Sequence, residues 1–253
     1  MKRIAFVSVT LLICSASFAQ PNKNVGSPAK NNAHLKAFYQ ALVSGDLNSG
    51  IVALNYYISE QGSNTPYADT LAMLYMQTGA YAQSYYWADQ RLKGKPEDNN
   101  LLEIKGYSLD KLQQPKEAIA VFETLYGRTK NPFHAYKLME LQYGIKRLAE
   151  CVATANSAEK LQFKPDYVMT YNVGEQTGRT YLQAGVYNIH ALALYDLDQK
   201  AEAKSYFAKA VALDSNFVLA RQNLDAVIAA EKNPGKVNTN SPNQPTNPAN
   251  KQN

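Results

Sequence analysis

The sequence predicts an all-α fold, an α-solenoid of about five helical hairpins with a short β-hairpin insert and a C-terminal capping helix. Three observations predict it. Apolar residues recur at helical spacing along most of the chain, small residues recur at a constant interval, and a segment near residue 170 breaks that interval with strand-like alternation. The interval, a period of about 34 residues, is typical of stacked helical hairpins.

The clearest hairpin starts at Tyr67. Leu71 and Leu74 recur at helical spacing in its first helix, Gly79 supplies a turn, and Pro96 ends the second helix. Glycine favours the left-handed backbone of such turns, and proline cannot continue a helix. This segment therefore predicts a helix, a tight turn and a second helix.

The neighbouring units keep the same phase. Gly106 lies one period after Ala72, and Ala118 lies one period after Ser84, so small residues return where two helices must approach closely. Gly45 likewise lies one period before the turn glycine of the clearest unit. The pattern resembles the tetratricopeptide repeat, an antiparallel helix pair of about 34 residues. The resemblance implies a protein-binding module whose first helices line a concave groove.

The later units are less regular. In the fourth unit Met139 occupies a position that usually holds Gly or Ala, and in the fifth unit, from Val186, His190 replaces the usual Leu. Ala191 follows Gly106 by 85 residues, whereas two periods of about 34 residues would give 68. About 17 residues are therefore inserted between the fourth and fifth units.

The insert predicts a β-hairpin over residues 166–183, because Tyr167, Met169 and Tyr171 alternate with other residues before a glycine-containing loop. It resembles an insert of some exported bacterial members of the family. An amphipathic helix over 217–232 is expected to cap the last repeat, so that the folded solenoid covers residues 32–232.

The ends of the chain predict export. Lys2 and Arg3 precede a short apolar run that ends in small residues, which is typical of a signal peptide over residues 1–19, cut between Ala19 and Gln20. The alternative, a lipoprotein signal acylated at Cys14, lacks the small residue expected before the cysteine. No transmembrane segment is expected in the mature chain, and residues 20–31 and the Asn-, Pro- and Gln-rich residues 233–253 are expected to be disordered. We therefore expect a periplasmic or outer-envelope location.

The net charge argues against nucleic-acid binding, and the cysteine count argues against an internal disulfide. Loss of Lys2 and Arg3 lowers the 26 basic residues to 24 against 21 acidic ones, a net charge of about +3. Nucleic-acid binding needs a concentrated basic stripe, so it is not expected. After removal of the signal peptide Cys151 has no partner, so stability must come from packing and not from a disulfide.

The family resemblance assigns groove positions to this chain. They are aromatic, acidic and apolar, which suits an extended protein or peptide segment. The alternative for each is an ordinary solvated or packing side chain. The predicted binding residues are Tyr39, Asp69, Met73, Glu103, Tyr107, Tyr136, Glu140 and Asn188, with Leu192 a further groove position.

No catalytic, metal or cofactor site is expected. Cys151 falls on a packing face, and His34, His134 and His190 lie in different repeats, so neither a thiol nucleophile with its base nor a metal-ligand pair is indicated. The sequence thus predicts a non-catalytic interaction module or scaffold in the cell envelope. The alternative is a glycan or cell-wall binding protein that uses groove tyrosines.

Overall fold

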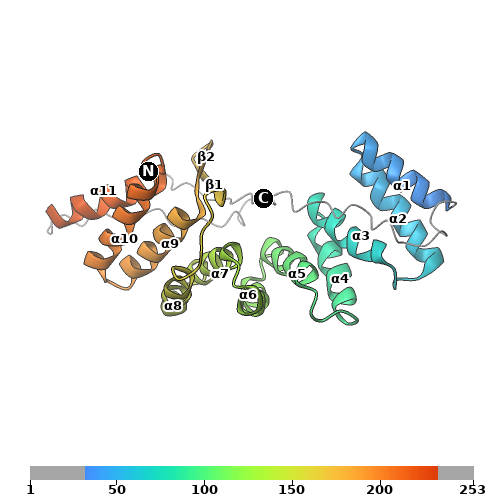
Figure 1. Ribbon diagram of the computed structural model, residues 1–253, viewed down its shortest axis with the longest axis horizontal. Helices are drawn as coiled ribbons and strands as arrows, with labels where there is room; N and C mark the ends of the chain where they lie inside the picture. The colour runs from blue at the N-terminus through green and yellow to red at the C-terminus, as the bar shows by residue number, and fades with distance from the viewer. Residues whose placement is uncertain (1–31, 233–253) are drawn as a thin grey trace, which may run out of the picture. The chain divides into compact units, whose positions relative to one another are not determined.

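A computed structural model describes residues 32–232 of the protein (Figure 1). Within this stretch, contacts define two compact units, residues 32–128 and residues 129–232. The stretch holds eleven α-helices and one two-stranded antiparallel sheet, which confirms the predicted all-α class with a short β-hairpin. The predicted signal peptide, linker and tail lie outside the described residues.

Each unit is built from antiparallel helix pairs. The first contains α1 (Ala33–Ser44), α2 (Leu47–Gln61), α3 (Pro66–Gln77), α4 (Tyr81–Leu92), α5 (Asn99–Lys111) and all but the last residue of α6 (Pro115–Thr129). The second contains α7 (Pro132–Gly144), α8 (Leu148–Ala158), β1 (Val168–Val173), β2 (Gln176–Tyr181), α9 (Leu182–Asp196), α10 (Lys200–Leu213) and α11 (Val218–Lys232). Within residues 32–232, no helix combines the length and apolarity that a bilayer crossing requires.

A residue with left-handed backbone follows the first helix of each hairpin. Gly45 (φ 74°) and Gly79 (φ 79°) follow α1 and α3, at the turns that the period predicts. The same conformation recurs one period after Gly79 at Gln113 (φ 60°), and again at Lys146 and Asp198 (both φ 62°). A residue with a Cβ loses about 1 kcal/mol there. Packing of the two helices, and not a local glycine, therefore imposes the turn at Gln113.

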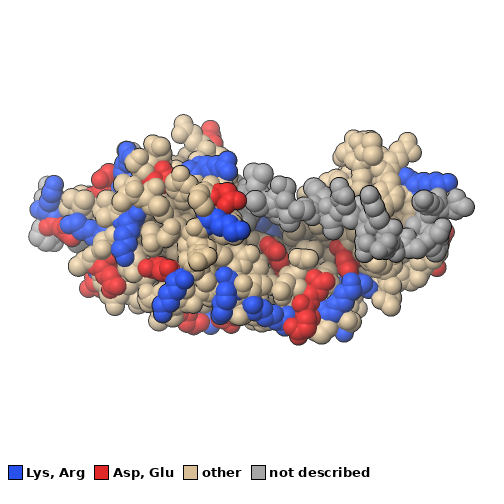
Figure 2. All heavy atoms as spheres, viewed as in Figure 1, with Lys and Arg blue, Asp and Glu red and all other residues tan. Residues whose placement is uncertain are grey.

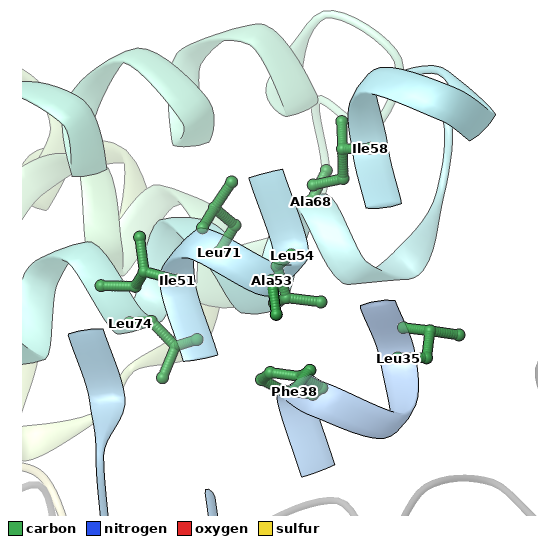
Figure 3. Close-up of a cluster of buried hydrophobic side chains, with 9 residues drawn as sticks. All are labelled: Leu35, Phe38, Ile51, Ala53, Leu54, Ile58, Ala68, Leu71 and Leu74. Atoms are coloured by element: carbon green, nitrogen blue, oxygen red, sulfur yellow. The ribbon is translucent and has the colours of Figure 1, made fainter. Parts of the chain in front are cut away.

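The core of the first unit includes an apolar cluster shared by α1, α2 and α3 (Figure 3). The side chain of Asn32 caps the start of α1 by accepting hydrogen bonds from the amides of His34 and Leu35, and the helix buries Leu35, Phe38 and Ala41. Every member of the cluster is at most 8% exposed. The members are Leu35, Phe38, Ile51, Ala53, Leu54, Ile58, Ala68, Leu71 and Leu74.

Small residues let the helices approach where the repeat period predicts close contact. A Cβ on Gly106 would lie 2.8 Å from Cε2 of the buried Phe122 ring. The Ser84 hydroxyl is buried and donates to the Ala72 carbonyl (2.9 Å), while the Ser108 hydroxyl donates to Ser84 (2.9 Å). These bonds satisfy buried polar groups that would otherwise cost stability.

Helix α9 lies at the centre of the second unit. It contacts α7, α8, α10 and both strands, so eleven of its fifteen residues are buried and its sequence lacks a clear polar face. Met139 of α7 is fully buried at the position where the repeat usually has a smaller residue. The predicted insert forms the antiparallel β1–β2 hairpin, which Figure 1 shows beside α9.

Candidate functional site

Two of the predicted binding residues in the first unit have polar partners inside that unit. The Tyr39 hydroxyl lies 3.0 Å from the Tyr67 hydroxyl. Asp69 forms ion pairs with Arg91 (2.5 Å) and Lys95 (2.6 Å), so two cations balance its carboxylate. The Asp69 and Tyr39 contacts stabilise the packing of helix on helix, and a binding role for these side chains stays a prediction.

The other three predicted residues of this unit lie on α3 and α5, which contact each other. Met73 is half-buried and packs against the small core of Ala72, Ala88 and Ile104. The Tyr107 ring packs edge-on against Phe122, with ring centroids 5.2 Å apart, and Glu103 is half-buried on the same helix. Their role in binding also stays a prediction.

The second unit brings its three predicted residues together. Tyr136, Glu140 and Asn188 line one small hollow, which is partly open to solvent and has a volume of about 40 Å³. Four elements of this unit form it: α7, β1, α9 and the start of α11. The other lining residues are Tyr143, Met169, Tyr171, Ile189, Leu192, Phe217, Leu219 and Asn223.

The hollow has apolar walls with few polar groups. The Asn223 amide donates to the Asn188 carbonyl oxygen at 3.0 Å, and both side chains are buried. Glu140 accepts from Lys137 at 2.7 Å, so the carboxylate that reaches the hollow is balanced by a cation on the same helix. The lining therefore contains two amide side chains, and the charge of its Glu140 carboxylate is balanced by Lys137.

The tyrosines of α7 contribute uncharged walls. Burial, and then the nearby Glu140 carboxylate, raise the pKa of Tyr136 well above its usual value. Burial and the Asp196 carboxylate raise the pKa of Tyr143 in the same direction. Tyr136 is 3% exposed and Tyr143 is 2% exposed. Both phenols consequently stay neutral at any physiological pH.

Tyr171 anchors the hairpin to the rest of the unit. Its hydroxyl donates to the Asn216 carbonyl (3.2 Å) and accepts from the Val218 amide (3.1 Å), at the first residue of α11. Its ring lies against Phe217, with centroids 4.8 Å apart. The Tyr171 ring also covers Gly178 on the paired strand, where a Cβ would lie 2.5 Å from Cζ. The hairpin is therefore a fixed wall of the hollow.

The second strand and α9 complete this anchoring. The Thr180 hydroxyl donates to the Asp214 carboxylate at 2.6 Å, which ties β2 to the segment before α11. Gly185 leaves room for the Met169 thioether, which a Cβ at that position would overlap. Met169 is thereby held against α9 beside Tyr136, whose ring also approaches Gly185.

The sequence indicated only part of this lining. Met169 and Tyr171 carried a signal, strand-like alternation, but that signal did not show which helices the hairpin would contact. Phe217, Leu219 and Asn223 belong to the expected capping helix or its first residue, and an apolar spacing alone does not distinguish a cap from the wall of a site.

Comparison with known proteins identifies the repeat. Residues 184–217, which include most of α9 and all of α10, match the family model described as a tetratricopeptide repeat. This chain carries a tetratricopeptide repeat. The match covers one helical hairpin, α9 with α10, at the place where the sequence pattern predicted the fifth unit.

Solved structures with tetratricopeptide repeats share the fold. A crystal structure of MamA protein is 15% identical over 72% of this chain and 90% of that chain, with a TM-score of 0.60. YrrB, titled a TPR protein with an unusual peptide-binding site, is 13% identical over 79% of this chain and 90% of that chain, with a TM-score of 0.59. MamA 41-end from Desulfovibrio magneticus RS-1 is 16% identical over 76% and 98%, with a TM-score of 0.59. No curated protein matches the chain.

His190 is a buried polar residue of the tetratricopeptide repeat. Its Nδ1 lies 2.6 Å from the Glu159 carboxylate, and its ring lies 4.0 Å from the Tyr206 ring. Burial lowers the pKa of His190, against the Glu159 hydrogen bond, which raises it. The side chain is 1% exposed and joins α9 to α10 and to the end of α8.

Cys151 has the environment of a packing residue. It is fully buried, its Sγ lies 3.5 Å from the Met139 carbonyl oxygen, and burial raises the pKa of the thiol to about 12. A nucleophilic cysteine needs an accessible, low-pKa thiolate. Among residues 32–232, no group of three or more His, Cys, Asp or Glu side chains is placed to hold a metal ion. Tetratricopeptide repeats are generally non-catalytic interaction modules.

Proposed function

We propose that this protein is a non-catalytic interaction module or scaffold of the cell envelope, and that it binds a protein partner over the small hollow of the second unit. One observation carries the proposal. Three predicted groove residues, Tyr136, Glu140 and Asn188, meet the hairpin residues Met169 and Tyr171 around a single hollow. A generic repeat does not require that hairpin, so its place in the wall favours a dedicated site.

The chemistry of the lining favours a neutral segment with apolar side chains. Binding sites are mostly apolar, with a few polar groups that fix the orientation of the ligand. Here aromatic and aliphatic side chains form the walls, and the amides of Asn188 and Asn223 hydrogen-bond to each other, which adds a neutral polar group to the lining. A solved protein of the same fold is titled for its peptide-binding site, which agrees with this mode.

Nucleic acid is a poor fit as the partner. Figure 2 shows basic and acidic side chains interspersed on the face in view, over each of the two units. Binding to a phosphate backbone relies on a concentrated basic surface. Interspersed charge is instead typical of a solvated surface that leaves recognition to a local site.

Stacking of a sugar ring on the tyrosines of the hollow is not supported. A sugar ring stacks on an exposed aromatic face. The three tyrosines of the hollow, Tyr136, Tyr143 and Tyr171, are each at most 3% exposed. Little of their ring surface is therefore available for stacking.

The envelope location rests on the sequence of residues 1–19. If the chain is exported, the intact mass of the protein from its own cells will correspond to a polypeptide that begins at Gln20, and fractionation will recover it outside the cytoplasm. An intact mass that retains residues 1–19 in a cytoplasmic fraction would contradict this part of the proposal and leave the peptide site untouched.

The peptide site is tested by selection from a random peptide display library on the full chain, followed by measured affinity of the selected peptides. The variant Leu192→Lys places a charge on a lining residue that is 5% exposed, so circular dichroism must first show that the variant keeps the parent fold. The control Leu197→Lys makes the same change at a residue that is 39% exposed and does not line the hollow.

We expect Leu192→Lys to weaken binding by about tenfold or more, since one desolvated contact contributes about 1.4 kcal/mol or more in a hot spot. The Leu197→Lys control should bind like the parent chain. Selected peptides that bind both variants equally, while both retain the helical circular dichroism of the parent, would refute the site.

A further inference from the structure

The hairpin has a second surface, separate from the hollow, and its hydrogen-bond register defines it. The Leu182 amide donates to the Tyr167 carbonyl (2.9 Å), and this pair continues the register of Met169 with Thr180 and Tyr171 with Gly178. In an antiparallel ladder, bonded and non-bonded pairs alternate. Val173 and Gln176, which flank the two-residue turn, fall in the bonded set as such turns require.

The remaining residues of β2 direct their backbone groups away from β1. By this alternation the N–H and C=O groups of Thr177, Arg179 and Tyr181 point to the outer edge of the hairpin. All three residues are exposed, Tyr181 at 43%. Among the described residues, these outward backbone groups have no hydrogen-bond partner.

The edge is rigid and has little protection. Tyr171 and Thr180 fasten the hairpin to the segment around α11, so the strand is held in an extended form before any partner arrives. Natural edge strands are usually blocked by charges, proline or a covering element. β2 contains no proline, and Arg179 is its one charged residue.

Charge on this edge selects the kind of partner. Arg179 is exposed and has no hydrogen-bond or ion-pair partner within residues 32–232. It lies between Thr177 and Tyr181 among the residues whose backbone groups point outward. A partner strand with a carboxylate opposite the Arg179 guanidinium gains a cross-strand ion pair, and opposite charges at facing positions stabilise a sheet.

A second copy of this chain is a poorer occupant. Antiparallel pairing of two β2 strands that uses all three outward residues places Arg179 directly opposite Arg179 of the other copy. Like charges at facing positions destabilise a sheet. Any other register between two β2 strands lets fewer of Thr177, Arg179 and Tyr181 form main-chain hydrogen bonds with the other copy.

We propose that the outer edge of β2 binds an extended segment of a protein partner by strand addition, with an acidic residue of that segment opposite Arg179. Main-chain hydrogen bonds supply the affinity in this mode, and the facing side chains supply the specificity. The surface is independent of the hollow between α7, α9, β1 and α11, and either can bind without the other.

The test uses the full chain, labelled with ¹⁵N, and a capped synthetic heptapeptide of sequence Thr-Val-Thr-Glu-Thr-Val-Thr. We expect the peptide to protect the amides of Thr177, Arg179 and Tyr181 from hydrogen exchange. The amides of Gly178 and Thr180 already donate to β1, so their protection should not change. An alternating pattern of this kind distinguishes strand addition from binding in the hollow.

Two matched variants distinguish the contribution of the Thr177 backbone amide to peptide binding from that of its side chain. Thr177→Pro removes one outward N–H and keeps the inner ladder, because proline is tolerated on an edge where its nitrogen faces solvent. Thr177→Ala loses the same hydroxyl bond to Asn172 but keeps the N–H. We expect Thr177→Pro to weaken peptide binding by about tenfold and Thr177→Ala to leave it nearly unchanged.

Three outcomes would overturn the proposal. The first is the absence of new protection at Thr177, Arg179 and Tyr181 at millimolar peptide. The second is equal binding by Thr177→Pro and Thr177→Ala, or by a peptide with Lys in place of Glu. The third is protection that appears without peptide and rises with protein concentration, which would assign the edge to a second copy. Because Leu192→Lys alters the hollow alone, it should not change this binding.

Discussion

The helical glycines Gly106 and Gly127 allow a matched test of how closely the repeats pack. Both lie in helices of the first unit, α5 and α6. A Cβ on Gly127 would meet nothing within 4 Å. A Cβ on Gly106 would meet three atoms of the Phe122 ring, at 2.8, 3.1 and 3.2 Å, and that ring is fully buried.

The expected magnitudes follow from two opposed effects. Alanine in place of a helical glycine stabilises by about 0.5–1 kcal/mol, because glycine loses more conformational freedom on folding. Overpacking of a well-packed core costs about 1–3 kcal/mol. The Phe122 ring also packs on Tyr107, at a centroid distance of 5.2 Å, so it has little freedom to move aside. We expect Gly127→Ala to stabilise by about 0.5–1 kcal/mol and Gly106→Ala to destabilise by about 0.5–2 kcal/mol.

Urea unfolding followed by tryptophan fluorescence measures this difference. Trp87 is the sole tryptophan of the chain and packs against the core of the first unit, so its emission reports the unit that holds both glycines. Circular dichroism recorded on the same samples shows whether the two units unfold together, which decides how the free energies are extracted.

A Gly106→Ala variant as stable as Gly127→Ala would refute the packing argument. A double-mutant cycle with Phe122→Leu provides the control. Once the ring is gone, the cost of Ala at position 106 should fall, and the free energy of interaction between the two sites should be about 1 kcal/mol or more.

Three further predictions concern the second unit. Gly178→Ala should displace Tyr171, whose two hydroxyl hydrogen bonds contribute about 1 kcal/mol each, and hydrogen exchange at the start of α11 should accelerate; unchanged exchange there would contradict the anchoring. Burial lowers the pKa of His190 in the folded state, so the free energy of unfolding should be highest above the unfolded pKa of about 6.5 and should fall as the pH drops below that value. Between pH 7.5 and 5.5 the His190→Leu variant should lose less of this free energy than the parent chain. An equal loss in both proteins would exclude His190 as the cause. With its thiol pKa raised to about 12, Cys151 should resist iodoacetamide at pH 8 until the chain is unfolded; rapid alkylation of the native protein would show that it is accessible.

The sequence by itself determined the features that depend on local pattern. The repeat period located the turns at Gly45 and Gly79 and the close approach at Gly106, because these need a particular residue type at a particular spacing. Alternation over residues 166–183 likewise predicted the hairpin, which spans Val168–Val173 and Gln176–Tyr181. Such signals are readable in one chain because each depends only on residue type and on spacing along the sequence.

The left-handed turn at Gln113 could not be predicted from the residue types near it. Glutamine has no preference for a left-handed backbone, so no neighbouring residue type indicated that conformation. Gly106 and Tyr107 of the helix before the turn pack against Phe122 of the helix after it, and this packing compensates for the local cost. A period, rather than the residue at the turn, was the usable signal.

The tertiary structure alone decided which of the predicted binding residues lie together. Tyr136, Glu140 and Asn188 line one hollow, whereas Asp69 is held by Arg91 and Lys95. The hollow depends on contacts such as that of Tyr171 with Val218, 47 residues apart, which no periodicity encodes. Helical spacing shows which face of an element is apolar, but the element that covers it, or leaves it open to a partner, is selected by the energy of packing the whole unit.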